Sequence, residues 1–274
     1  MPEEPMPRRR GRRPARTREQ LREDTVQTGM RLLAEHGLSI GLDTVRLDDV
    51  IQAAGVPRAS TYRAWTDPSG AHGPQSRFHE ALITRLLESQ DNSTSPLNGL
   101  EHTEDATITA ARKVFAEMPQ PTSDLTADER RYWLRQAIRA AGNANQEAKN
   151  QARLWHCSLA ISSGLLTSAS DQTLSQLSEA WRRGESSAVA RYEQLYEAVV
   201  DLFHLRLNPG YTWQQFDTAA AALADGLIIR QQIAPETQHV VLPTGPNEEP
   251  QDWSLYAIGL DALFAQFFNM PEEP

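Results

Sequence analysis

Cysteine is almost absent from this chain, since Cys157 is the single one among 274 residues. One thiol cannot form an intramolecular disulfide or supply the cysteine set of a structural zinc site. Apolar stretches are short, and none approaches the roughly 18 consecutive apolar residues that a membrane helix needs. The arginines near residue 10 are not followed by the apolar core of a secretory signal. We therefore expect a cytoplasmic protein with no membrane partner.

Motifs for enzymatic chemistry are also missing. The sequence has no glycine-rich phosphate loop and no serine in a glycine-flanked nucleophile elbow. His79 and Glu80 lack the second histidine that a zinc-binding helix would need. The sequence therefore predicts a protein that is not an enzyme and needs no metal or other cofactor.

Positive charge is concentrated at one end of an acidic chain. Residues 1–66 hold 12 Lys and Arg against 9 Asp and Glu, whereas the rest hold 15 against 27. A basic end on an acidic body is expected when that end meets a polyanion. The composition of residues 1–17 predicts a disordered basic arm. We expect this arm to lie along DNA phosphates; the alternatives are sequence reading in the minor groove and purely non-specific attraction to DNA. The arm's candidate phosphate-binding residues are Arg10, Arg12 and Arg13.

Apolar residues recur at helical spacing along most of the chain, and no alternating strand series is seen. The fold class is therefore expected to be all-α, with one short extended piece at 240–242. Gly29 lies on the apolar face of the first helix and predicts a close contact with another helix. Helices are expected at 18–36, 46–54, 58–65, 77–89, 103–117, 126–145, 147–167, 171–206, 213–233 and 253–269.

The stretch "VIQAAGVPRASTYRAW", residues 50–65, predicts two short helices joined by a tight turn at Gly55. Val56 can fill the core between them, and Pro57 suits the entrance of the second helix. That helix carries hydroxyl and guanidinium groups, which can bond base edges and phosphates in the major groove. A three-helix, helix-turn-helix DNA-binding domain over 18–76 is therefore expected.

The same residues resemble the DNA-binding domain of the TetR-type (tetracycline-repressor-like) transcriptional regulators. The matching pieces are "GMRLLAEHG", "LDDVIQAAGVPRASTYRAW" and "SRFHEALITRLL", which lie within residues 18–88, about a quarter of the chain. The resemblance implies that residues 77–274 form a larger helical domain for ligand binding and dimerisation. It also implies a homodimer that binds a palindromic DNA operator.

Carried over by position, the resemblance assigns DNA contacts to the second of the two short helices. Trp65 stands where the family has a core aromatic residue, so packing is expected there. Arg46 replaces the usual Ser or Thr at the start of the preceding helix and is either a phosphate ligand or a surface residue. Arg77 replaces a lysine after a lengthened loop, which leaves its alignment open. The candidate DNA-binding residues are Arg46, Arg58, Ser60, Thr61, Tyr62, Arg63 and Arg77.

Residues 221–235 resemble the family's penultimate, dimerising helix. Phe264, Phe267 and Phe268 form an apolar stripe on the last helix, which we expect to join a four-helix dimer bundle with part of it in the core. For the effector pocket the residues allow two interpretations, pocket lining or ordinary core packing, with a reactive thiol as a further possibility at Cys157. The candidate lining residues are Trp133, Trp155, His156, Cys157 and Tyr196.

The sequence thus predicts a homodimeric repressor that a small molecule of unknown identity releases from its operator. An activator or a ligand-independent regulator of the same fold is one alternative. A helical protein-interaction module with a non-specific nucleic-acid-binding arm is another.

Overall fold

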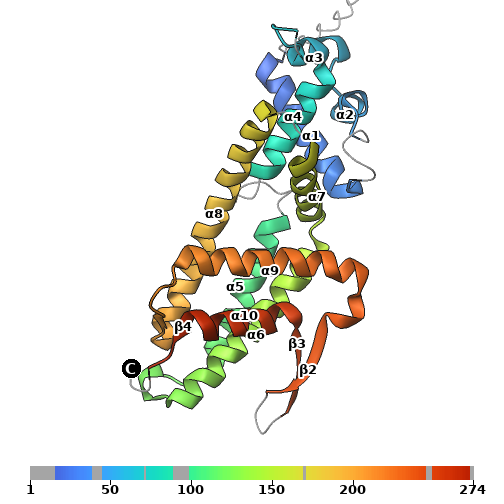
Figure 1. Ribbon diagram of the computed structural model, residues 1–274. Helices are drawn as coiled ribbons and strands as arrows, with labels where there is room; N and C mark the ends of the chain where they lie inside the picture. Colours follow the sequence, from blue (N-terminus) through green and yellow to red (C-terminus); the bar gives the residue numbers. More distant parts are fainter. Residues whose placement is uncertain are drawn as a thin grey trace, which may run out of the picture. The chain divides into compact units, whose positions relative to one another are not determined.

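The computed structural model describes residues 16–38, 45–70, 72–88, 99–168, 171–244 and 249–271, and this part of the chain is mostly helical (Figure 1). The expected all-α class is therefore confirmed, although four short strands accompany the helices. The elements are α1 (Arg18–His36), α2 (Leu47–Ala54), α3 (Arg58–Trp65), α4 (Pro74–Glu88), α5 (Gly99–Glu117), η2 (Thr122–Asp124), α6 (Ala127–Gln151), α7 (Arg153–Ser168), α8 (Asp171–Phe203), β1 (Arg206–Leu207), α9 (Trp213–Ile233), η3 (Pro235–Thr237), β2 (His239–Pro243), β3 (Pro250–Ser254), α10 (Leu255–Phe267) and β4 (Phe268–Asn269).

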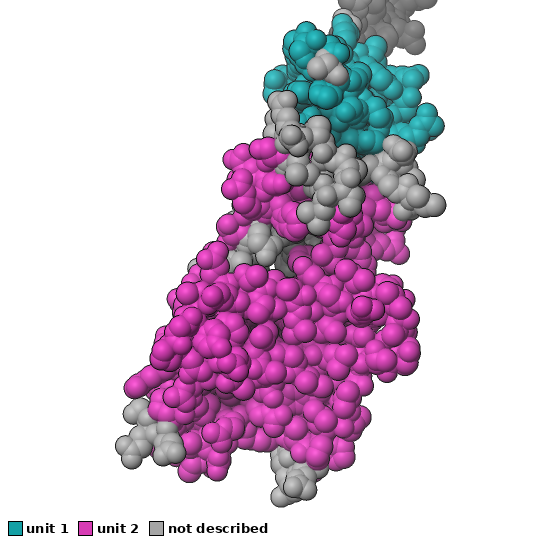
Figure 2. Space-filling view, viewed as in Figure 1, with its two compact units in different colours: residues 1–32, 39–82 teal, residues 33–38, 83–274 magenta. Residues whose placement is uncertain are grey.

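The chain forms two compact units, which Figure 2 colours separately. Unit 1 comprises residues 1–32 and 39–82, and unit 2 comprises residues 33–38 and 83–274. Unit 1 thus extends into α4, beyond the boundary expected at residue 76. The extension has a local cause, because α4 begins at Pro74 and its residue Phe78 is fully buried.

Trp65 is a core residue of unit 1, as its place in the sequence predicts. Its side chain is 3% exposed, and its indole N–H donates to the Thr25 hydroxyl over 3.1 Å. The ring meets Phe78 edge to face at a centroid distance of 5.7 Å. The close contact predicted at Gly29 is also confirmed, because a Cβ there would lie 3.0–3.1 Å from side-chain atoms of Leu82 and Phe78.

A glycine turn joins α2 and α3. Gly55 has φ +61°, a left-handed conformation that glycine adopts without steric cost. The Gly55 and Val56 N–H groups donate back to the carbonyls of Gln52 and Ile51, which closes the end of α2. Val56 is 7% exposed and fills the core behind the turn, as expected. The turn therefore fixes α3 against α2.

Unit 2 is built around α6, which packs on α5 and α10. A capping box starts α6, since Thr126 and Glu129 bond each other's backbone N–H groups, and Thr212 and Gln215 start α9 in the same way. α10 also packs on α9. Phe216 of α9 lies at the centre of an aromatic cluster that includes Tyr196, Phe264, Phe267 and Phe268.

This cluster corrects the expected role of the last helix. Phe264, Phe267 and Phe268 are 4%, 8% and 6% exposed within a single chain, so they belong to its own core rather than to a dimer bundle. The helix also ends at Phe267, because Phe268 enters β4 and pairs with Leu207 of β1. α10 packs on α6 and α9 of the same chain, which accounts for the burial of this stripe.

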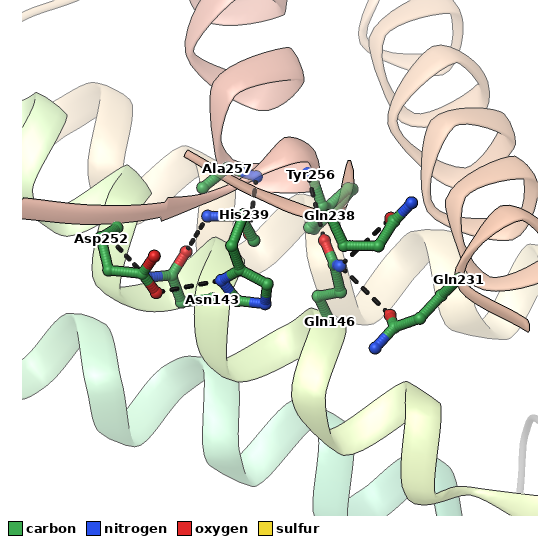
Figure 3. A network of polar contacts seen from close by, with 9 residues as sticks. Asn143, Gln146, Gln231, Gln238, His239, Asp252, Tyr256 and Ala257 are labelled. Atoms are coloured by element: carbon green, nitrogen blue, oxygen red, sulfur yellow. Dashed lines mark hydrogen bonds and ion pairs between the residues drawn. The ribbon is translucent and has the colours of Figure 1, made fainter. Parts of the chain in front are cut away.

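The extended piece expected at 240–242 is confirmed as β2, which pairs antiparallel with β3. Asn143 of α6 donates to the Asp252 carbonyl and accepts from the Ser254 N–H, and so holds β3 (Figure 3). Gln146, one turn further along α6, bonds Gln231 and Gln238 and accepts from the Tyr256 N–H. Amide side chains of α6 therefore fix the β2–β3 hairpin and the start of α10.

Within the described part of the chain, no helix is long and apolar enough to cross a membrane. The same residues hold no group of three or more His, Cys, Asp or Glu side chains placed to bind a metal ion.

Candidate nucleic-acid interface and internal pocket

The exposed side of α3 carries two of the predicted DNA-binding groups, and both are held by one carboxylate. Arg58 Nη2 lies 2.9 Å from Oδ2 of Asp48, and the Tyr62 hydroxyl donates to Oδ1 of the same residue over 2.9 Å. The Arg58 guanidinium also lies 5.5 Å from the centre of the Tyr62 ring. α2 therefore supplies an acidic residue that positions the donors of α3.

The remaining predicted DNA-binding residues of α3 differ in their exposure to solvent. Arg63 is exposed and Ser60 is half-buried. Thr61 is a correction, because its side chain is 0% exposed and its hydroxyl donates to the Pro57 carbonyl over 2.9 Å. It faces the core because it lies on the same side of α3 as Ala64 and Trp65, so it cannot reach DNA from this conformation.

Arg46 occupies the N-cap position of α2, is exposed, and makes no capping bond with its side chain. The first turn of α2 is capped by Gln75 of α4 instead, whose side-chain oxygen accepts from the Leu47 N–H over 2.7 Å. The Arg46 guanidinium is therefore not needed to cap the helix. Arg77 lies further along α4 and is half-buried.

Two arginines of α1 bind the C-terminal end of α3. Arg22 donates to the Ala64 carbonyl over 2.8 Å, and Arg18 donates to the carbonyls of Ala64 and Thr66 over 3.0 Å. Cations at a helix C-terminus are stabilised by the helix dipole. Burial, Arg18 and Arg77 together lower the pKa of Arg22, so three positive charges gather beside this helix end. The predicted arm residues Arg10, Arg12 and Arg13 lie outside the described residues.

Unit 2 contains a cavity with about 40 Å³ of free volume, lined by residues of α5, α6, α8 and α10. Phe115, Ile138, Leu260 and similar apolar side chains form most of its wall. Its polar lining is contributed by Thr107, Asn145, Tyr192, Tyr196 and Tyr256. The cavity is roomy enough for a few water-sized groups, since one water needs roughly 10–15 Å³ of such space.

Tyr196 is the one predicted pocket residue that lines this cavity. Trp133 packs against the aromatic core of unit 2 instead. Trp155 lies under the Lys149 ammonium at 4.1 Å, and burial lowers the pKa of the neighbouring His156. Cys157 is 3% exposed and burial raises its pKa, which argues against a reactive thiol. These four residues do not line the cavity, so the core-packing interpretation fits them better.

The residues that the sequence interpretation missed are polar partners, and one of them, Asp48, lies within a matching piece without having been given a role. Asp48 and Gln75 make the contacts that hold α3 and cap α2, and Asn145 places an amide in the cavity. Asp48 and Tyr62 are 14 residues apart, and this spacing does not predict the contact between them. A possible signal for Asn145 is its position in α6, where an amide lies among apolar residues that recur at helical spacing.

No protein-family model matches this chain, and no match was found among curated proteins or solved structures. The functional assignment therefore depends on the motif residues and on the contacts described above.

Proposed function

We propose that this protein is a sequence-specific DNA-binding transcriptional regulator of the TetR type, acting as a homodimeric repressor. The observation that carries the proposal is the arrangement of Arg58 and Tyr62 on the exposed side of α3, directly after the Gly55 turn. A helix presented in this way suits the major groove, where a guanidinium can bind guanine or phosphate and a phenol can bind phosphate. Arg46 and Arg63 flank the pair as exposed cations.

α9 supports the dimer, because its outward side lacks charge. Its acidic residues Asp217 and Asp225 are buried and half-buried, and Arg230 is its one fully exposed charged residue. Thr218, Ala222, Gly226, Ile229 and Ile233 are exposed and recur at intervals of three or four residues, which places them on one side of the helix.

Exposed apolar side chains concentrate next to this face of α9. Within the described residues, the exposed large hydrophobic side chains are Ile229, Ile233, Val240 and Val241, which all fall in one segment of α9 and β2. Ile233 is 68% exposed and Val241 is 65% exposed. An uncharged helix face beside exposed apolar residues favours contact with a second copy of the chain. In a two-fold symmetric dimer, each half of a palindromic operator would then bind one recognition helix.

The cavity of unit 2 is the proposed effector site. A ligand that prefers the conformation with low DNA affinity by a few kcal/mol would release the operator. A test of this mechanism must therefore measure two properties, namely DNA binding by unit 1 and ligand binding by unit 2.

The test is selection of bound sequences from a random duplex pool at physiological salt concentration. We expect an inverted repeat, bound roughly 10³-fold more tightly than random DNA. Binding without any enriched motif, and with an affinity that vanishes as salt rises, would instead support the protein-interaction module with a non-specific arm. Placing the recovered repeat before a reporter gene then separates repression from activation.

A further inference from the structure

The cavity of unit 2 is uncharged. No Asp, Glu, Lys, Arg or His is among the described residues that line it, and aromatic and aliphatic side chains dominate the wall. Transferring an ion from water into such a space costs far more than transferring a neutral molecule. The wall therefore selects against charged ligands.

The phenols in the wall do not change this property with pH. Tyr196 and Tyr256 are 8% and 5% exposed, and burial raises the pKa of both hydroxyl groups. Both side chains stay neutral across the physiological range.

Asn145 gives the cavity one specific polar feature. The residue is 2% exposed, and its amide nitrogen donates to the Thr107 hydroxyl over 3.1 Å and to the Tyr192 hydroxyl over 3.2 Å. Its amide oxygen is buried and has no hydrogen-bond partner among the described residues. A buried acceptor without a donor costs about 1–3 kcal/mol, so a ligand that supplies the donor gains binding energy.

We infer that this cavity binds an uncharged, largely apolar small molecule that donates one hydrogen bond to the Asn145 side-chain oxygen. Alcohols and phenols are the simplest members of this class. The inference names the ligand class of the proposed effector site and depends on the proposed function only for the effect on DNA binding. Ligand binding itself requires only the side chains that line the cavity.

The free volume adds a condition on how such a ligand enters. About 40 Å³ is well below the roughly 150 Å³ of an engineered cavity that accepts benzene. A molecule with one aromatic ring therefore enters only if wall side chains such as Phe115 or Phe264 rearrange. Because the wall is shared by four helices, binding would change their packing.

The test measures direct binding of phenol and toluene to the full-length protein by isothermal titration calorimetry. The two probes have nearly the same shape, but only phenol donates a hydrogen bond. We expect phenol to bind about tenfold more tightly than toluene, and benzoate and benzylammonium not to bind. Equal affinity for phenol and toluene, tighter binding of a charged probe, or no binding of phenol would overturn the inference.

Three variants test whether the ligand binds in this cavity. Asn145→Leu should remove the preference for phenol while leaving toluene affinity unchanged or higher. Ala111→Leu, which fills the cavity from α5, should abolish binding of both probes. Ala116→Leu on the exposed side of the same helix is the matched control and should bind phenol as the wild type does. Unchanged phenol affinity in Ala111→Leu would place the ligand elsewhere and overturn the inference.

The two proposals fail in different ways. If phenol binds with the expected preference but leaves operator affinity unchanged, the inference holds and the proposed effector role is wrong. If the protein selects no operator sequence, the phenol and toluene titrations still decide the ligand class.

Discussion

The Asp48 carboxylate accepts from both Arg58 and Tyr62, with each contact 2.9 Å long. The two donors are therefore held in position before DNA arrives, but they are held by a negative charge that also repels phosphate. We expect Asp48→Asn to increase operator affinity by roughly threefold to fivefold, since an exposed ion pair is worth about 0.2–1 kcal/mol. Fluorescence anisotropy with the selected operator measures the change.

Asp49→Asn is the matched control for this variant. Asp49 is the next residue of α2 and is exposed, so its substitution removes the same charge from the same helix. An equal gain in both variants would mean that net charge, rather than the contact with Arg58 and Tyr62, sets the affinity.

Tyr62→Phe and Arg58→Ala should affect DNA binding differently. Loss of the Tyr62 hydroxyl would remove the proposed phosphate contact, so affinity should fall about fivefold for all duplexes alike. Loss of the Arg58 guanidinium should relax the preference at particular base pairs by about 1–3 kcal/mol. Selection experiments on each variant report the two effects. An unchanged motif for Arg58→Ala together with wild-type affinity for Tyr62→Phe would contradict the assignment of α3 as the recognition helix.

Gly55→Ala should destabilise unit 1 by about 1 kcal/mol, because φ +61° places an alanine Cβ in an unfavourable conformation. No other part of the described chain lies within 4 Å of that Cβ, so the cost comes from the backbone conformation of residue 55 itself. Gly164→Ala is the control and should increase the free energy of unfolding, because Gly164 lies within α7 with open space around it and alanine favours a helix more than glycine does. Urea unfolding followed by circular dichroism compares the two variants with the wild type.

Asp217 makes the stability of unit 2 depend on pH. Its carboxylate is buried without a partner among the described residues, and burial, assisted by Glu193, raises its pKa to about 7. The unfolded chain releases this proton near pH 4, whereas the folded chain keeps it until about pH 7. Stability should therefore fall by about 2–4 kcal/mol as pH rises through this window and then level off.

Asp217→Asn should remove this loss and be more stable than the wild type at pH 8 but not at pH 4. Thermal unfolding across this range measures the difference. Asp201→Asn, which changes an exposed carboxylate of α8, is the matched control and should follow the wild-type profile. Parallel profiles for wild type and Asp217→Asn would show that this carboxyl group is not the cause.

Ile233→Glu should weaken the proposed dimer about tenfold or more, because it places a charge on the uncharged face of α9. Ala116→Glu adds the same charge at an exposed position of α5, outside that face, and should dimerise as the wild type does. Sedimentation equilibrium gives both dissociation constants. A monomeric wild type, or equal losses in the two variants, would contradict the proposed interface.

The sequence could predict most helices because their signals are local. Glycine turns, capping residues and apolar spacing lie within a few residues of the elements that they define, as at Gly55 and Thr126. β3 was missed and α10 was expected to start at 253, because an extended strand in this segment depends on pairing with β2 and on bonds from Asn143. Such long-range contacts leave no periodic signal in the strand itself.

The candidate sites were predictable to different degrees. Arg58 and Tyr62 could be found because a motif fixes their positions, but the motif could not show that Thr61 faces the core. Of the predicted pocket residues, Tyr196 is the one that lines the cavity. Aromatic side chains in a helical body can belong either to a core or to a cavity wall, and only the packing of the helices decides between the two. The burial of Phe264 likewise depends on α9 lying beside α10.

The contacts of Gln146 have a consequence for the order in which the chain folds. Its side chain bonds Gln231, Gln238 and Tyr256, which lie 85, 92 and 110 residues further along. During synthesis the side of α6 that packs on α10 therefore stays uncovered until most of the remaining chain has left the ribosome, whereas unit 1 contains no residue beyond 82. We expect unit 1 to fold first and unit 2 to be the part that depends on chaperones and aggregates when translation is interrupted.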